Sequence, residues 1–390
     1  MRAGLLAFAV AACALSAAPR PASAQVAFPP PPLLPSVALP GLSARYAVPN
    51  AVIARFRADP PRCGEEDVRP LHAEEPFPSG FIETPERIVD ASAVLSFRID
   101  AGGRTLSISE PRREGESRAD LGDIPAVLAT WRFPSRRARR NCSIRFRIVA
   151  VPLERVDTET LYRFVASHGF ERPPPLPLAS AAFARLMPQG SNCMPAPRAL
   201  QSPMPDTRRL AQAPGSSVWT VLTYDLDPAG APVGARVAAS SGNERFDRRS
   251  VTTIGRARFR PGVRRGCLRY FYNFAPLPSD EIPARPYALS SGRNCPAERG
   301  LLAAMPRPLP PPAFRARPVG GWVALRYDVL EGGAVGNAEV LAAEPAAAFG
   351  REALRLAAGA RVPKAAPAAG CVAIVRFPIV ARVVPARLRI

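Results

Sequence analysis

Six cysteines are the residues whose type and spacing could support the most chemistry. In chain order they form the pairs Cys63 and Cys142, Cys193 and Cys267, and Cys295 and Cys371, separated by 79, 74 and 76 residues. Nearly constant spacing indicates one crosslink in each copy of a repeated module. A metal site is the alternative, but the chain has no Cys-x-x-Cys motif and only 2 histidines, the ligands that structural zinc sites use. We therefore expect three disulfides and no metal site.

The remaining polar residues give little support for catalysis. His168 ends a predicted helix at 158–167, where a cation suits the helix dipole, and nothing near His72 completes a catalytic triad. Aspartates recur at predicted strand ends, where their side chains can shape a turn by bonding to the backbone; they are Asp100, Asp227 and Asp328. We therefore expect no enzyme activity, no catalytic residue and no cofactor.

The first residues predict export. Arg2 precedes an apolar run from Ala3 to Ala18, and the small residues Ala22-Ser23-Ala24 stand before Gln25. The run is shorter than the roughly 20 residues that a membrane-spanning helix needs, so residues 1–24 are predicted to be a cleavable signal peptide. A lipobox with a lipidated Cys13 is the alternative. We expect a periplasmic protein with no transmembrane helix in its mature part.

Proline tracts divide the chain. The sequence has 48 prolines, and tracts of them behave as stiff, extended spacers. The predicted order is signal peptide 1–24, Pro-rich linker 25–45, first module 46–170, Pro-rich linker 171–190, second module 191–282 and third module 283–390.

The same order of elements recurs between the cysteines of each pair. An alternating strand runs into a glycine-containing turn, a second strand and a helix follow, and a closing strand begins at the second cysteine. The first strands are 94–100, 218–227 and 322–330, and the helices are 121–131, 243–256 and 346–360. The expected fold class is therefore α+β, with three tandem modules that each pack a three-stranded antiparallel sheet with one or two helices.

This order resembles the C-terminal, or energy-transducer, domain of TonB-family proteins. In the third module, 321–329 is similar to the family's first strand, 333–341 to its turn and second strand, and 349–360 to its helix. Residues 312–316 stand in place of the family's first helix, without its tyrosine, and Arg361-Val362-Pro363 stands for its Arg-aromatic-x-Pro motif. The other modules keep shorter pieces, namely Ser240-Ser241-Gly242, Phe246-Asp247, Arg258-Phe259-Arg260-Pro261 and Trp131-Arg132-Phe133-Pro134.

The resemblance implies a binding role. A TonB-family transducer has a membrane helix coupled to a proton-driven motor, and its final strand receives an extended peptide from an outer-membrane receptor. This chain has a cleavable signal, three modules and cysteine pairs instead, so coupling to a motor is not expected. The corresponding final strands are 143–149, 268–274 and 372–380, and we expect them at sheet edges, where a peptide can add as a strand.

The second module provides the preferred edge. Pro378 lacks a backbone donor and would interrupt such pairing in the third module. The predicted peptide-binding edge is Leu268, Arg269, Tyr270, Phe271, Tyr272, Asn273 and Phe274. The alternative is that a neighbouring module or a Pro-rich linker covers these edges.

Arginine gives the chain its formal charge of +20, because Lys364 is the only lysine. An arginine-rich coding bias explains this composition simply, although a basic surface also attracts polyanions. Clusters precede the second cysteine in two modules and form a candidate anion-binding set, Arg136, Arg137, Arg139, Arg140, Arg264 and Arg265. Ordinary solvated loops are the alternative for these residues. The aromatic residues at 270–272 fit a strand core better than a nucleic-acid platform.

Two functions follow from these patterns. The first is a non-enzymatic, TonB-like periplasmic binding or scaffold protein, linked to outer-membrane receptor transport, whose partner is a protein of the periplasm or outer membrane. The second is a basic cell-envelope protein that binds lipopolysaccharide or another anionic polymer. No nucleic-acid partner is expected.

Overall fold

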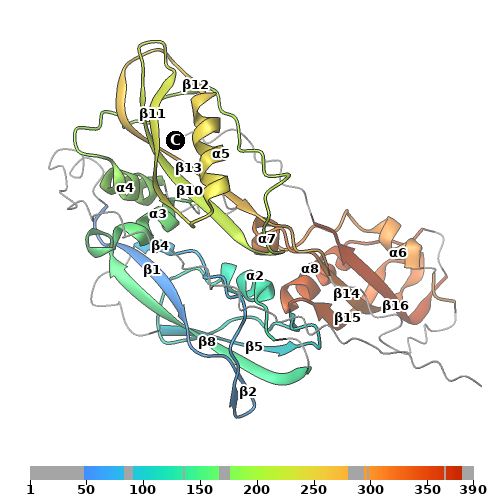
Figure 1. Ribbon diagram of the computed structural model, residues 1–390. Helices are drawn as coiled ribbons and strands as arrows, with labels where there is room; N and C mark the ends of the chain where they lie inside the picture. The colour runs from blue at the N-terminus through green and yellow to red at the C-terminus, as the bar shows by residue number, and fades with distance from the viewer. Residues whose placement is uncertain are drawn as a thin grey trace, which may run out of the picture. The chain divides into compact units, whose positions relative to one another are not determined.

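Each of the three modules is built around an antiparallel sheet in the computed structural model (Figure 1). The structure describes residues 48–82, 91–134, 137–166, 176–279, 294–296, 298–363 and 366–379. The predicted signal peptide and first linker, Cys13, Arg136 and His168 lie outside these residues. The mixture of helices with several small antiparallel sheets confirms the predicted α+β class.

The second module shows the repeated unit most simply. Its sheet has the strand order β11-β10-β13, and one helix, α5, covers one face. The elements are β9 (Ala199–Gln201), β10 (Ser217–Leu226), β11 (Pro232–Ser240), α5 (Glu244–Gly255), β12 (Arg258–Phe259) and β13 (Arg264–Phe274). Helix α5 begins after Asn243 because that side chain accepts a hydrogen bond from the backbone N–H of Phe246 at 3.0 Å. Phe246 and Ile254 then bury against the sheet.

The third module repeats this arrangement with the order β15-β14-β16. Its elements are α6 (Glu298–Ala304), α7 (Pro312–Ala316), β14 (Gly321–Val329), a 3-10 turn (Glu331–Gly333), β15 (Val335–Glu344), α8 (Ala347–Ala358) and β16 (Ala368–Phe377). Helix α8 buries Phe349, Ala353, Leu356 and Ala357, which share one face at helical spacing. Residues 312–316, which the resemblance assigns to a first helix, do form helix α7.

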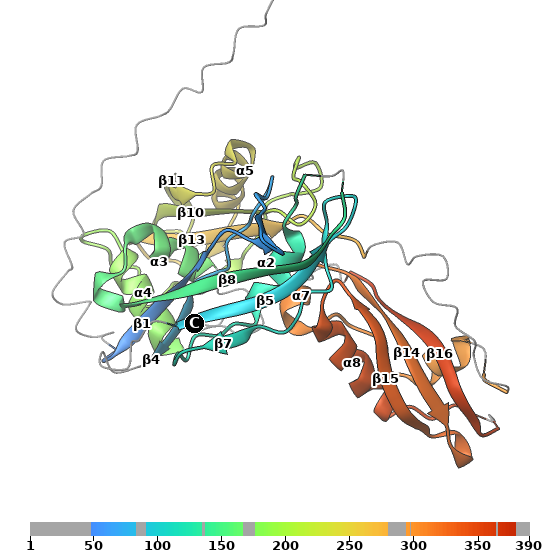
Figure 2. The same ribbon diagram turned by 90° about the horizontal axis from the view of Figure 1, so that it is seen from below.

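The first module has a larger sheet than predicted. Its elements are β1 (Ala51–Ala58), β2 (Arg62–Cys63), β3 (Glu66–Asp67), β4 (Ser79–Ile82), β5 (Ala91–Ile99), β6 (Thr105–Leu106), β7 (Arg112–Glu114), α2 (Asp123–Thr130), β8 (Arg139–Pro152) and a 3-10 turn (Leu153–Arg155). Strand β8 pairs with β5 on one side and with β1 and β2 on the other (Figure 2). The prediction that the final strand of this module lies at a sheet edge is therefore wrong.

Two further helices follow the first module. Helix α3 (Thr158–Ala166) and helix α4 (Leu176–Leu186) pack against each other and against β1, in a cluster that includes Ile53, Phe164 and Leu178. The same cluster receives Leu268 and Tyr270 from β13. Helix α4 lies inside the segment 171–190, which the proline content assigns to a linker, so this segment contributes to the core.

Equivalent contacts support the internal repeat. The three predicted disulfides are confirmed, since Cys63–Cys142, Cys193–Cys267 and Cys295–Cys371 are bonded. The residue before each second cysteine has a positive φ; these residues are Asn141 at 53°, Gly266 at 65° and Gly370 at 67°. In every module the carbonyl of a turn glycine also accepts a backbone N–H from the segment that follows the helix and ends in proline. The donors are Phe133 to Gly103, Phe259 to Gly230 and Val362 to Gly333, at 2.8, 3.0 and 2.7 Å.

The modules contact one another through polar and apolar groups. One hydrophobic cluster contains core residues of both the first and the third module, including Leu95, Phe146, Val323 and Phe349. Beside it, the Glu344 carboxylate accepts bonds from Arg98 and from the Ser107 hydroxyl, both at 2.7 Å. The first and third modules are therefore joined by a common core in addition to the chain that links them.

Candidate functional site

Strand β13 contains all seven residues of the predicted peptide-binding edge and is the outer strand of its sheet. It pairs with β10 without a register shift from Ser217 opposite Phe274 to Tyr224 opposite Cys267. The structure therefore places this set on one continuous strand at a sheet edge.

The direction of the β13 backbone groups follows from one hydrogen bond beyond the strand. The Ala275 N–H donates to the Ser216 carbonyl at 2.9 Å, so the backbone of Ala275 points toward β10. In an antiparallel ladder the backbone groups of successive residues point alternately toward the neighbouring strand and away from it. Arg269 and Phe271 therefore bond to β10, whereas Leu268 and Tyr270 direct their N–H and C=O groups outward.

The outward backbone groups of β13 are unpaired over a short stretch. Within the described part of the chain, no backbone group beyond β13 bonds to Leu268 or Tyr270. Tyr272 and Phe274 take part in further contacts, so the open edge is defined here as Leu268 to Phe271. An extended segment placed along it could bond to both outward N–H groups and both outward carbonyls.

The side chains of β13 are packed on both faces of the sheet. Cys267 and Phe271 belong to the core under α5, whereas Tyr270 packs toward helix α4, with its ring centroid 6.1 Å from that of Phe183. Burial raises the pKa of the Tyr270 phenol to about 12, so this side chain stays neutral. A partner would thus meet mainly backbone, with half-buried side chains on either side.

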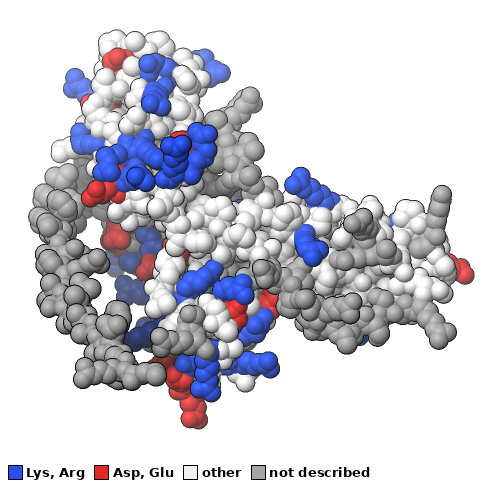
Figure 3. Space-filling view, turned by 45° about the vertical axis from the view of Figure 1, so that its right-hand side comes forward, with Lys and Arg blue, Asp and Glu red and all other residues white. Residues whose placement is uncertain are grey.

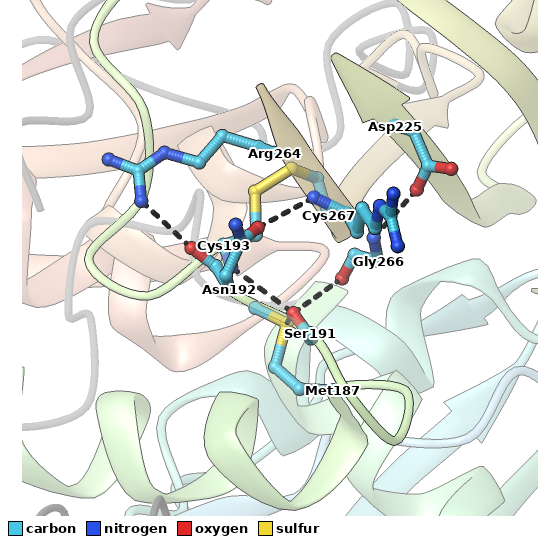
Figure 4. Close-up of a disulfide and its surroundings, with 9 residues drawn as sticks. Met187, Ser191, Asn192, Cys193, Asp225, Arg264, Gly266 and Cys267 are labelled. Carbon is cyan, nitrogen blue, oxygen red and sulfur yellow. Dashed lines mark hydrogen bonds between the residues drawn. A yellow bond between two sulfur atoms is a disulfide. The ribbon is translucent and has the colours of Figure 1, made fainter. Parts of the chain in front are cut away.

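The disulfide of the second module marks one end of the open edge (Figure 4). The Ser191 hydroxyl donates to the Gly266 carbonyl at 3.0 Å, and the Asn192 N–H donates to the Arg265 carbonyl at 3.2 Å. The chain that enters Cys193 therefore occupies the beginning of β13, and the open edge starts directly after Cys267.

The equivalent edge in the first module is already filled. Strand β1 pairs antiparallel with β8 from Val52 opposite Pro152 to Ala58 opposite Phe146. The next residue, Asp59, donates its N–H to the Arg145 carbonyl at 2.8 Å, and Arg145 stands where β13 has Tyr270 when Cys142 and Cys267 are aligned. The edge of this module thus accepts an added strand, supplied by the chain itself.

The second module lacks such a strand because a helix precedes its first cysteine. Strand β1 ends five residues before Cys63, and most of the corresponding stretch before Cys193 forms the second half of helix α4. Neither β1 nor its role was predicted from the sequence. The alternation that leaves Phe56 buried between half-exposed Arg55 and exposed Arg57 was the available signal.

The third module also ends its sheet on the predicted strand, β16. Ile374 and Arg376 on this strand take part in further contacts, and Pro378 follows it. Strand β13 is therefore the better candidate.

The predicted anion-binding arginines lie on two loops with different surroundings. Arg139 forms an ion pair with Glu66, and its hydrogen bond lowers the pKa of Glu66. Arg137 and Arg140 are exposed, as is Arg265, whereas Arg264 donates to the Asn192 carbonyl at 3.0 Å. On the face shown in Figure 3, basic side chains gather in separate groups, several with acidic side chains beside them.

Other candidate chemistry is sparse. The His72 Nε2 atom lies 3.3 Å from a Glu74 carboxylate oxygen, and the Asp100 and Asp227 side chains accept the N–H groups of Arg104 and Ala231, as predicted for turns. Asp328 instead accepts the Gly370 N–H across the sheet. The described residues contain no metal-binding group of three or more His, Cys, Asp or Glu side chains, and no helix long and apolar enough to span a membrane.

Comparison with known proteins adds no relatives. No known family model matches the chain, and no curated protein is significantly similar to it.

Proposed function

We propose that this chain is a non-enzymatic binding protein of the bacterial periplasm that takes an extended segment of a partner protein onto the open edge of β13. The resemblance to TonB C-terminal domains motivates the strand-addition mode. Three disulfides are consistent with an oxidising compartment outside the cytoplasm. A partner in the outer membrane, linked to receptor transport, would fit the same resemblance.

The pairing of β1 with β8 is the observation that carries this proposal. Two related modules present the same edge, and one of them holds an extended strand there over seven consecutive residue pairs. In the other, the outward groups of Leu268 and Tyr270 have no backbone partner within the described chain. Main-chain hydrogen bonds to such an edge provide affinity, and the flanking side chains provide selectivity.

Two substitutions at Tyr270 test the mode of binding. Tyr270→Ala and Tyr270→Pro both remove the ring that packs on Phe183, but only proline also removes the outward N–H. We expect a displayed library of random peptides, selected on the exported and disulfide-bonded chain, to yield ligands that bind the alanine variant and lose at least about tenfold in affinity for the proline variant, which corresponds to about 1.4 kcal/mol.

Circular dichroism and peptide mapping of the disulfides would show that both variants are folded. Proline at Leu268, paired with alanine at the same position, repeats the comparison at the other outward N–H. Ligands that bind the alanine and proline variants equally well would show that strand addition at this edge is wrong.

The polyanion hypothesis rests on a different observation. The exposed side chains of Arg137, Arg140 and Arg265 have no ion pair with any described carboxylate. Binding of inorganic polyphosphate through such residues would fall steeply between about 50 and 200 mM salt, whereas backbone pairing at β13 would change little. Polyphosphate binding that is lost in an Arg137→Gln, Arg140→Gln variant would favour this second function.

A further inference from the structure

The strand that fills the edge of the first module also supplies negative charge. Asp59, directly after β1, pairs with Arg147 of β8 at 2.7 Å, and Glu66 in β3 pairs with Arg139 at the start of β8. The segment from Ala51 to Asp67 therefore provides both backbone pairing and carboxylates. Its carboxylates lie toward its C-terminal end.

The arginines of β13 have no such partner. Arg264 stands three residues before its cysteine, as Arg139 does, but it bonds to a backbone carbonyl. Arg265 is exposed, and its side chain forms no hydrogen bond or ion pair with the described residues. Half-buried Arg269 bonds to the Ser202 hydroxyl at 2.6 Å and lies 5.5 Å from the centre of the Phe271 ring.

The acidic group beside this site is already engaged. The Asp225 carboxylate accepts the Gly266 N–H at 2.7 Å across the sheet (Figure 4), and no carboxylate of the described residues forms an ion pair with Arg264, Arg265 or Arg269. A carboxylate would bind a guanidinium such as that of Arg269 more strongly than the Ser202 hydroxyl does, because a charge-assisted hydrogen bond is stronger than one to a neutral group.

We propose that the segment bound by β13 is a short β-prone run followed, toward its C-terminus, by carboxylate side chains. An antiparallel partner, oriented as β1 is on β8, runs from Phe271 toward Leu268. Its backbone must leave β13 there, because Ser191 and Asn192 bond to Gly266 and Arg265, so beyond Leu268 only its side chains can reach the guanidinium groups of Arg265 and Arg264. The acidic residues must therefore follow the paired residues. This inference rests on the proposed function and adds the chemical class of the partner.

Four fluorescent peptides of equal length test this inference on the full exported chain. All four contain the same run of valine and threonine. In three of them this run is followed by glutamates, glutamines or lysines, and in the fourth the glutamates precede the run. We expect the peptide with C-terminal glutamates to bind about tenfold more tightly than the glutamine peptide, since two partly screened charge pairs contribute about 0.7 kcal/mol each. The peptide with N-terminal glutamates should bind no better than the glutamine peptide.

Matched arginine variants assign the effect to this edge. Arg265→Gln should remove much of the advantage of the C-terminal glutamates, and Arg264→Gln should remove the rest. Arg140→Gln, at the position in the first module that corresponds to Arg265, should leave the advantage unchanged.

The outcomes separate the inference from the function on which it rests. Equal binding of the glutamate and glutamine peptides, both weakened by Tyr270→Pro, would overturn the acidic partner and leave strand addition standing. Binding that follows peptide charge regardless of its placement and is unaffected by Tyr270→Pro would overturn both. A peptide with C-terminal glutamates that is selected over its reversed counterpart would support both.

Discussion

Arg317 is the residue at which all three modules meet. Its side chain is fully buried and forms two hydrogen bonds, of 2.6 and 2.7 Å, with the Asp123 carboxylate in α2. Its guanidinium also lies 4.9 Å from the ring centre of Phe77 and 5.2 Å from that of Phe274 at the end of β13. Arg317 thus connects the third module to the first and to the strand that carries the open edge.

Removal of Arg317 should destabilise the protein strongly. Arg317→Ala leaves the Asp123 carboxylate without its cation in a largely buried site, and breaking such a pair costs about 3 kcal/mol or more. Arg326→Ala is the control because its pair with Glu339 is exposed and contributes less than about 1 kcal/mol. Urea unfolding with the disulfides intact measures both, and equal losses would show that this junction does not hold the modules together.

Residue roles could be predicted where they depend on local chemistry or on the repeat. The cysteine pairs follow from their spacing, and the bonds of Asp100 and Asp227 follow from turn chemistry. Arg317 could not be found in this way. Its partner Asp123 is 194 positions away, and in the sequence Arg317 is one arginine among many.

At the scale of elements, the turn after the first strand of each module determines how closely the chain segments approach. Gly230 has a φ of 79°, and a Cβ atom there would lie 2.3 Å from the Phe259 carbonyl oxygen. This close approach explains why glycine stands at this point of the turn. It also places the aromatic-x-Pro segment against the turn.

Substitution of Gly230 should therefore disrupt the second module. Gly230→Ala combines a positive φ with a clash against the backbone and should cost about 3 kcal/mol or more. Gly234→Ala, in the same hairpin, also has a positive φ but no atom within 4 Å of the new Cβ, so about 1 kcal/mol is expected. Thermal unfolding compares the two, and a similar loss in both would contradict the role given to the turn.

Helices and long strands could be predicted well from periodicity, whereas edge strands could not. The predicted helices at 121–131, 243–256 and 346–360 correspond to α2, α5 and α8 within a few residues. The alternation around Phe56 could have indicated strand β1, but its pairing with β8, about 90 positions later, has no local pattern in the sequence. Helix α4 was missed because its prolines suggest a spacer, although Pro177 lies in its first turn, where proline is tolerated.

At the scale of the whole molecule, the modules that the sequence separates are joined by shared packing. The Ile108 N–H donates to the Pro345 carbonyl at 2.9 Å, and the Ala347 N–H donates to the Ile108 carbonyl at 2.8 Å. These bonds lie beside the core that the first and third modules share. Composition marks segment ends but contains no information about which modules touch, so this packing could not be predicted.

Shared packing also has a functional consequence for the candidate site. The open edge of β13 lies between a disulfide at its start and the Arg317 contact with Phe274 at its end. Because β13 is held at both ends, its outward N–H and C=O groups are already in place before a partner binds, which lowers the entropic cost of association. These two contacts therefore favour strand addition at β13.

Amide hydrogen exchange along β13, resolved by residue with NMR, tests the central claim most directly. In the free protein, the N–H groups of Leu268 and Tyr270 should exchange rapidly, whereas those of Arg269 and Phe271, bonded to β10, should be protected. Addition of the peptide with C-terminal glutamates should protect Leu268 and Tyr270. Slow exchange at these two residues in the free protein, or no protection when the peptide is bound, would contradict the account.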